Sequence, residues 1–175
     1  MGQEIELSPV TRITANCVGP PGKRTFYIQA RKDDEIVTLL CEKFQVQQLA
    51  AGIEQFVTEL QEKFPDLPVA VVDYLEAEME LEEPLEPLFR VGQMGLGYDA
   101  ENDLLVLVAQ ELVDEEDGDE ADSSSARLWA SRSQMLSMGA YGSQVAAQGR
   151  PICGNCLQPM EPEGHFCPRR NGHQH

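Results

Sequence analysis

The sequence predicts an α+β fold in which a β-β-β-α unit is duplicated. Apolar residues first alternate with polar ones and then recur at every third or fourth position, and this change of period occurs twice along the chain. The segments follow the same order both times. We therefore expect a duplicated domain over residues 1–149, with an antiparallel sheet and two packing helices, followed by a small tail at residues 150–175.

The first unit is expected at residues 11–64. Ile13, Ala15 and Cys17 alternate with polar residues, which is typical of a half-buried strand. Apolar residues then recur at threes and fours from Val46 onward, which predicts a helix that ends before a proline. The predicted elements of this unit are strands at residues 11–18, 25–31 and 36–41 and a helix at residues 45–64.

The second unit is expected at residues 89–149, after a connector rich in Pro and Glu at residues 65–88. Ser131 with Gln134 three positions later forms the pattern of a capping box, which predicts the start of the second helix. The predicted elements of this unit are strands at residues 89–97, 104–112 and 127–130 and a helix at residues 131–148.

Single residues also recur between the two units. Arg12 lies 78 positions before Arg90, whereas Gln45 lies 89 positions before Gln134. The difference of 11 positions is about the length of the Asp- and Ser-rich run at residues 114–125. We therefore interpret this run as a solvated loop that is inserted before the third strand of the second unit.

The tail has the residue types and spacing of a zinc site. Cys153 and Cys156 form a C-x2-C turn, and His165 and Cys167 lie two positions apart in a second segment. Three thiolates and one imidazole give the four tetrahedral ligands of a structural Zn2+ site, with His173 as the alternative fourth ligand. A closed site of this kind leaves no position for a substrate, so it predicts a fold-holding metal and does not indicate which reaction, if any, the protein performs.

Charge restricts the partners. Thirty acidic and thirteen basic residues give a net charge of −17, which disfavours nucleic acid and anionic membranes. The first residues are acidic and lack the pattern of a signal, and the longest apolar run, residues 104–109, is too short to span a bilayer, so we expect a cytoplasmic protein. That run is apolar on both faces, which fits either a central strand or a strand at a homodimer interface.

Several segments together carry a family resemblance along nearly the whole chain. They are the glycine- and proline-rich segment at residues 19–29, the residues at 42–45, 89–92, 97–99 and 129–134, and the cysteine tail. With these segments the chain resembles the bacterial family called domain of unknown function 3090. The resemblance implies a small cytoplasmic repeat protein with a C-terminal Cys/His tail, and it assigns no catalytic residues.

Two classes of function follow from the sequence. The first is a zinc-containing binding or regulatory module for another protein, for which the polar strand faces with Arg12, Thr14, Tyr27, Gln29 and Arg31 offer a surface. The second is an enzyme or binder that acts on a small anionic, phosphate-bearing ligand at the interface of the two units. Its candidate residues are the basic and amide side chains that recur in both units: Arg12, Lys43, Gln45, Arg90, Arg132 and Gln134.

A simpler interpretation exists for these recurring residues, because Arg and Lys also pair with local carboxylates and Gln can cap a helix. The sequence contains no Ser/His/Asp arrangement and no Gly-rich phosphate loop, so it does not decide whether the protein is an enzyme.

Overall fold

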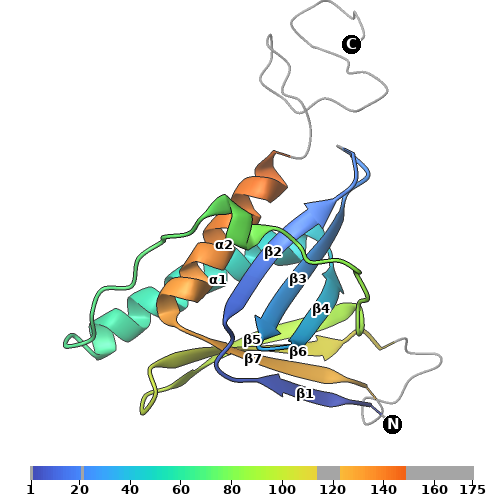
Figure 1. Ribbon diagram of the computed structural model, residues 1–175. Helices are drawn as coiled ribbons and strands as arrows, with labels where there is room; N and C mark the ends of the chain where they lie inside the picture. Colours follow the sequence, from blue (N-terminus) through green and yellow to red (C-terminus); the bar gives the residue numbers. More distant parts are fainter. Residues whose placement is uncertain (1, 21, 114–122, 149–175) are drawn as a thin grey trace, which may run out of the picture.

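The computed structural model describes residues 2–20, 22–113 and 123–148, and these form a mixed α+β fold with two sheets and two α-helices (Figure 1). One sheet has three strands in the order β2-β3-β4, and the other has four strands in the order β1-β7-β6-β5. The sequence predicted an antiparallel sheet. The structure has two separate sheets, and β1 pairs with β7 in the parallel direction.

The elements agree closely with the periods in the sequence. In the first half, the helix and its three strands are β2 (Arg12–Val18), β3 (Thr25–Lys32), β4 (Glu35–Cys41) and α1 (Lys43–Lys63). In the second half they are β5 (Val91–Asp99), β6 (Leu104–Glu111), β7 (Ser125–Ala130) and α2 (Arg132–Ala147). The capping box predicted at Ser131 is confirmed, because its hydroxyl accepts the Gln134 amide at 3.0 Å.

Two elements were not predicted from the sequence. They are β1 (Glu4–Leu7) and the short 3-10 helix η1 (Glu76–Met79). β1 has only four residues, too few for a reliable alternation, and it is held in place by parallel pairing of Leu7 with Leu128 and its neighbours.

The two halves are interleaved at the segments that lead into them. The amide of Val10, between β1 and β2, donates to the carbonyl of Trp129 in β7. In the other direction, Arg90 forms a parallel bridge with Leu40 of β4 just before β5 begins. In each half, the segment that precedes the first strand therefore bonds the third strand of the other half.

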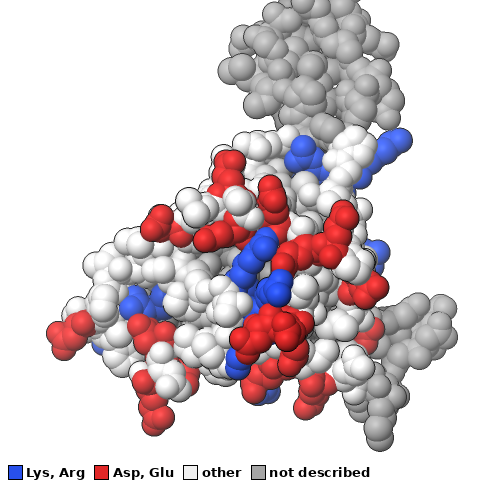
Figure 2. All heavy atoms as spheres, viewed as in Figure 1, with Lys and Arg blue, Asp and Glu red and all other residues white. Residues whose placement is uncertain are grey.

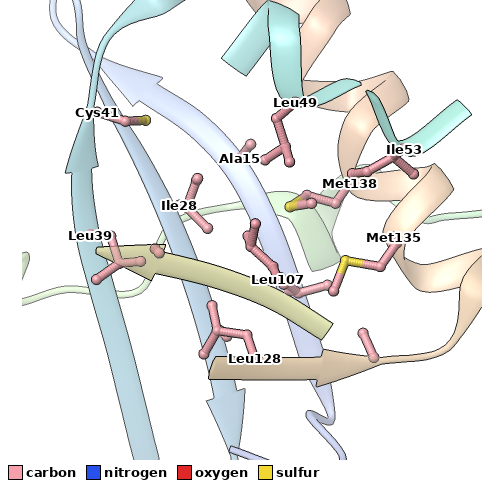
Figure 3. Close-up of a cluster of buried hydrophobic side chains, with 14 of the residues drawn as sticks. Ala15, Ile28, Leu39, Cys41, Leu49, Ile53, Leu107, Leu128, Met135 and Met138 are labelled. Carbon is pink, nitrogen blue, oxygen red and sulfur yellow. The ribbon is translucent and has the colours of Figure 1, made fainter. Parts of the chain in front are cut away.

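The core lies between the two sheets and the two helices, which pack side by side (Figure 1). Side chains from all of these layers meet there, and Figure 3 shows Leu107 and Leu128 from the four-stranded sheet facing Ile28 from the other sheet and Met135 from α2. All four of these side chains are fully buried. Alternate strand residues and one stripe of each helix supply this core, as expected from their periods.

The run at residues 104–109, which is apolar on both faces, lies in β6, and its position in the sheet explains its composition. β6 lies between β7 and β5, with Leu105 and Leu107 buried in the core. Val106, on the opposite face, is 6% exposed and is paired with Trp129 of β7. A central strand, which was one of the two interpretations of this run, therefore accounts for its composition.

The connector crosses the polar face of the three-stranded sheet (Figure 1). The carbonyl of Met79 accepts hydrogen bonds from Thr14 and Asn16, at 2.8 and 2.9 Å. Gln29 bonds both the amide and the carbonyl of Glu82, and it is 2% exposed. The polar strand face that the sequence suggested as a partner surface is thus covered by the chain's own connector, whose backbone needs these side chains as partners.

Some predictions lie outside the described residues. These are the tail with its candidate ligands Cys153, Cys156, His165, Cys167 and His173, and most of the acidic run, at residues 114–122. No helix in the described ranges combines the length and the apolar character needed to cross a membrane.

Candidate functional site

Of three recurring basic residues, Arg132 lies apart from Arg90 and Lys43. Arg90 pairs with Glu42 at 2.8 Å on the exposed surface, and Lys43 is exposed at the start of α1. Arg132 is 5% exposed, and its Nε lies 2.7 Å from Asp103 Oδ1. The structure therefore does not bring these three residues together at one point, and Arg90 and Arg132 pair with carboxylates from other elements.

The two recurring glutamines have a structural role at the helix starts. Gln45 Oε1 accepts the amide of Glu42, and Gln134 Oε1 accepts the amide of Ser131, each at 2.8 Å. Their amide nitrogens reach across to the opposite half: Gln45 Nε2 donates to Val91 O at 3.1 Å, and Gln134 Nε2 to Val10 O at 3.3 Å. Each glutamine thus caps its own helix and ties it to the other half.

Arg12 and Gln134, two of the predicted ligand residues, do line one cleft. It lies between the connector, the start of β2 and the start of α2, and it has a volume of about 440 Å3. Arg31 also lines it and pairs with Glu82, whose carboxylate is 3.8 Å from Arg12 Nη1. Arg12 Nη2 is buried and has no hydrogen-bond partner among the described residues.

The cleft carries both signs of charge. Asp73 and Glu78 line it in addition to Glu82, so three carboxylates face two guanidinium groups. Figure 2 shows basic side chains near the middle of the face that has β2 toward the viewer, with acidic side chains around them. An anion entering this cleft would have to compete with Glu82 for Arg12.

A second and larger hollow runs between α1 and β5. It has a volume of about 580 Å3, within the range of roughly 300–1,000 Å3 that is typical of ligand sites. Among the described residues, eleven line it and none of them has an ionisable side chain: Phe44, Gln45, Gln48, Leu49, Gly52, Phe56, Gly92, Gln93, Met94, Gly95 and Leu96. We call it the α1/β5 groove.

The groove follows the direction of both elements. Gln45 bonds Val91 at one end, and at the other the rings of Phe64 and Tyr98 lie 6.0 Å apart. Phe44 lines the groove, is 57% exposed and belongs to no core cluster. Phe side chains are more often buried. An uncharged hollow with an exposed aromatic side chain is typical of a binding surface.

The equivalent place in the other half is closed. There Tyr141, which corresponds to Gly52 by the offset of 89, accepts a hydrogen bond from Asn16 of β2 at 3.4 Å, and a Cβ atom at the next residue, Gly142, would be 2.9 Å from the Cβ of Ala15. At the groove, a Cβ atom at Gly52 of α1 would meet only Leu96 Cδ1, at 3.9 Å. Each helix thus lies against the first strand of the opposite half, but only α1 stands away from it.

No motif in the sequence points directly to this groove. Glycine at position 52 within a helix and glycines at 92, 95 and 97 within one strand are costly for local structure, and such glycines often mark a close approach of another chain or ligand. Gly52 and Gly95 were the available signal, because a Cβ atom at Gly92 or Gly97 would instead lie 2.8 Å from Leu112 Cα or 3.0 Å from Val106 Cγ1. Reasoning from charged residues missed them, because none of the lining residues is ionisable.

A comparison with known protein families places the whole described fold in one of them. The family described as a protein of unknown function (DUF3090) matches residues 5–167. The chain belongs to the DUF3090 family. No curated protein and no solved structure matches it. Both the α1/β5 groove and the Arg12 cleft lie within the matched part of this DUF3090 chain.

Within the described ranges of the DUF3090 chain, no group of three or more His, Cys, Asp or Glu side chains could hold a metal ion. Cys41 is buried, and burial, together with the nearby Glu42 carboxylate, raises the pKa of its thiol to about 12. Burial also raises the pKa of the Cys17 thiol. Both cysteines therefore resemble small apolar side chains more than nucleophiles.

Proposed function

We propose that this protein is a binding or regulatory module for another protein, and that the α1/β5 groove is its binding site. The observation that supports the proposal is the uncharged groove beside the exposed Phe44, at a place where the other half of the molecule is tightly packed. Uncharged, partly apolar surface of this kind is stabilised when a partner removes it from water.

A test of this function uses the full chain and a variant with a filled groove. Gly52→Leu places a side chain into the groove where only Leu96 is near, and leucine favours the helix more than glycine does. A displayed library of random nine-residue peptides is selected against the wild-type chain, and each binder is then measured against Gly52→Leu. We expect binders that lose affinity about tenfold or more in this variant.

The matched control is Thr58→Leu, an exposed position on another side of α1. It adds the same side chain without entering the groove, so binders should keep their affinity. If every selected binder binds wild type and Gly52→Leu equally well, the groove is not the site and the proposal fails.

We also propose that the domain at residues 1–149 arose as a duplicated β-β-β-α unit. In support, both halves have three strands followed by a helix, and Gln45 and Gln134 make equivalent bonds at the two helix starts. Val46 and Met135, which are 89 positions apart, are both fully buried. A duplicated unit is expected to keep residues with the same structural role at a constant separation in the sequence.

The zinc-binding tail completes the proposed module. The spacing of Cys153, Cys156, His165 and Cys167, with His173 as the alternative ligand, supports a single structural Zn2+ at residues 150–175. Such a metal orders a short segment with few large apolar side chains and performs no reaction. The proposed place of action is the cytoplasm, where thiolates stay reduced and available to the metal.

A second candidate function is the binding of a small phosphate-bearing ligand in the Arg12 cleft. The observation that favours it is that Arg12 and Gln134, from the two halves, line one cleft in which Arg12 Nη2 lacks a partner among the described residues. Inorganic phosphate titrated into the full chain tests it by calorimetry. Binding that Arg12→Met removes and that Arg90→Met keeps would support the site, whereas no heat at millimolar phosphate would exclude it.

A further inference from the structure

The edge of the four-stranded sheet that faces the groove is open. Among the described strands, β5 is the last of the sheet, and it pairs with β6 alone. In the described parts of the chain, no backbone group bonds the free edge of β5 between Gln93 and Tyr98. A strand in an antiparallel pair directs about half of its N–H and C=O groups to its outer edge, so this edge offers a row of unpaired donors and acceptors.

Apart from an irregularity in its pairing between Val91 and Gln93, β5 lacks the usual protection of an edge strand. Lys, Arg and Pro are absent from Val91–Asp99, and three of its nine residues are glycine. At the opposite edge of the same sheet, β1 has only four residues, two of which are glutamates. β5 is therefore the edge of this sheet that another strand can approach most easily.

α1 forms the second wall at a suitable place. Gln48, Gly52 and Phe56 follow one another at single turns of the helix and all face the groove. Gly52, in the middle of this row, leaves open the space that a side chain would fill. The helix therefore holds a channel open along the free edge instead of covering it.

From this geometry we infer that the groove takes an extended segment of a partner protein, which adds to the sheet as a new strand along β5. The inference rests on the proposed function and specifies the kind of partner. An extended segment satisfies the backbone groups of β5 while it buries its own. A helix in the same groove would leave the β5 edge unpaired.

The lining determines the side chains of this segment. Side chains of a strand alternate between two faces, so every second residue points toward α1 and meets Phe44, Leu49 or Phe56. A charged side chain on that face would lose its hydration without gaining an ionic partner. We therefore expect apolar residues at alternate positions over about six residues, the length of β5 from Gln93 to Tyr98.

The charge of the protein determines the ends of the segment. The chain carries a net charge of −17, and near one end of the groove Glu59 follows Phe56 by one turn while Asp99 ends β5. Lys and Arg on both sides of the apolar stretch complement this charge and speed association. The same charge opposes pairing of the β5 edges of two copies of this chain.

The test uses the nine-residue peptides selected against the full chain. Strand addition predicts that these peptides have apolar residues at alternate positions and basic residues at both ends. N-methylation of every second peptide amide should lower the affinity about tenfold or more in one of the two registers, in which the amides face β5, and should have little effect in the other. Bound peptide should also slow hydrogen exchange at β5 amides between Gln93 and Tyr98, while amides of the opposite edge strand, β1, stay unchanged.

The outcomes separate the inference from the function on which it rests. Peptides that depend on an open position 52 but show helical spacing, and that lose affinity to the same extent when amides of either parity are N-methylated, would overturn strand addition and leave the groove as the site. Peptides unaffected by Gly52→Leu would overturn both. A wild-type dimer in sedimentation that Gly52→Leu converts to a monomer would show that a second copy fills the groove, and would overturn the partner segment.

The variant must be folded for these outcomes to count. Its melting curve and far-UV spectrum should match those of Thr58→Leu. If Gly52→Leu does not fold, Gly52→Ala serves as the second variant, because its single methyl group meets Leu96 at an ordinary contact distance. Gly52→Ala should lower the affinity for the selected peptides by a smaller factor than a larger side chain does. If the affinity is the same with glycine, alanine and larger side chains at position 52, the inference is contradicted.

Discussion

Arg132 at the start of α2 holds Asp103 on the β5–β6 turn by two hydrogen bonds, of 2.7 and 3.0 Å. Gln61 of α1 accepts a third bond from the same guanidinium group at 3.3 Å. Tyr98 also donates its hydroxyl to Asp103, at 2.8 Å. One residue that recurs in both halves therefore connects the two helices to a turn, instead of facing a ligand.

This pair makes the fold sensitive to acid. The bonds from Arg132, and to a smaller extent the one from Tyr98, hold the pKa of Asp103 below its ordinary value. The ordinary pKa of Asp is about 3.9, and the pair stabilises the fold fully at pH values above it. This stabilisation is lost as the pH falls from there through the lower pKa of Asp103 in the folded state. Asp103→Asn should lower the urea midpoint at pH 7 and flatten its decline between about pH 5 and 3.

Glu42→Gln is the control for that experiment. Its partner, Arg90, is about half exposed, and such surface pairs contribute about 0–1 kcal/mol. The urea midpoint should change little at any pH. An equal response of both variants would mean that the buried position of Arg132 has no effect on the strength of its pair.

Two of the helix glycines, Gly52 and Gly142, should respond in opposite directions to alanine. Gly52→Ala adds a methyl group in open space and should raise the free energy of unfolding by about 0.5–1 kcal/mol through helix propensity. Gly142→Ala places a Cβ 2.9 Å from both Ala15 Cβ and Val46 Cγ1, so it should lower that energy by about 1–3 kcal/mol. Chemical denaturation measures both, and stabilisation by both would show that α2 and β2 are not tightly packed.

Truncation of the buried helix residues tests the equivalence of the two halves. Val46 and Met135 are 1% and 0% exposed. Met135→Ala should cost about 2–5 kcal/mol, and Val46→Ala should show a comparable though smaller loss because fewer atoms are removed. Gln47→Ala, at an exposed position next to Val46, should cost little. A negligible cost at Met135 beside a large one at Val46 would contradict the proposed equivalence.

The high pKa of Cys41 predicts slow chemistry. With a pKa of about 12, almost none of this thiol is ionised at pH 8, and it is 3% exposed. A thiol reagent should therefore label Cys41 only as fast as the protein unfolds, as mass mapping of the labelled peptides would show. Labelling within seconds under native conditions would contradict the buried position.

Metal content tests the tail independently of the groove. Elemental analysis of reduced protein should find one zinc per chain, and Cys153→Ser or Cys167→Ser should remove it. His165→Ala should weaken binding more than His173→Ala. Chelation should leave the main unfolding transition in place, because the described core uses no metal ligand. Fully reduced protein without zinc would contradict the site.

Local patterns determined most elements of this fold, while pairing across the chain had to come from the structure. The alternation at Ile13, Ala15 and Cys17 and the capping box at Ser131 are local features, and both predicted the observed element. The β1–β7 pair joins residues far apart in sequence, and no local period encodes it.

The candidate site shows the same division. Arg12 and Gln134 were selected because they recur, and they do line one cleft, while Arg132 recurs for a structural reason. The groove depends on how far α1 stands from β5, a distance of tertiary packing that Gly52 alone does not reveal. Residues that recur in both halves identified equivalent positions, but tertiary packing gives these positions different roles in the two halves.

The pairing of β1 with β7 also has a consequence during synthesis. Gln3 bonds Ser124, 121 residues later. At about 5–20 residues added per second, the N-terminal strand waits at least about six seconds for its neighbour to be made. During this interval Ile28 and Leu39 lack the packing that Leu107 and Leu128 later provide. The nascent first half therefore displays an apolar surface that chaperones at the ribosome can bind before the second half covers it.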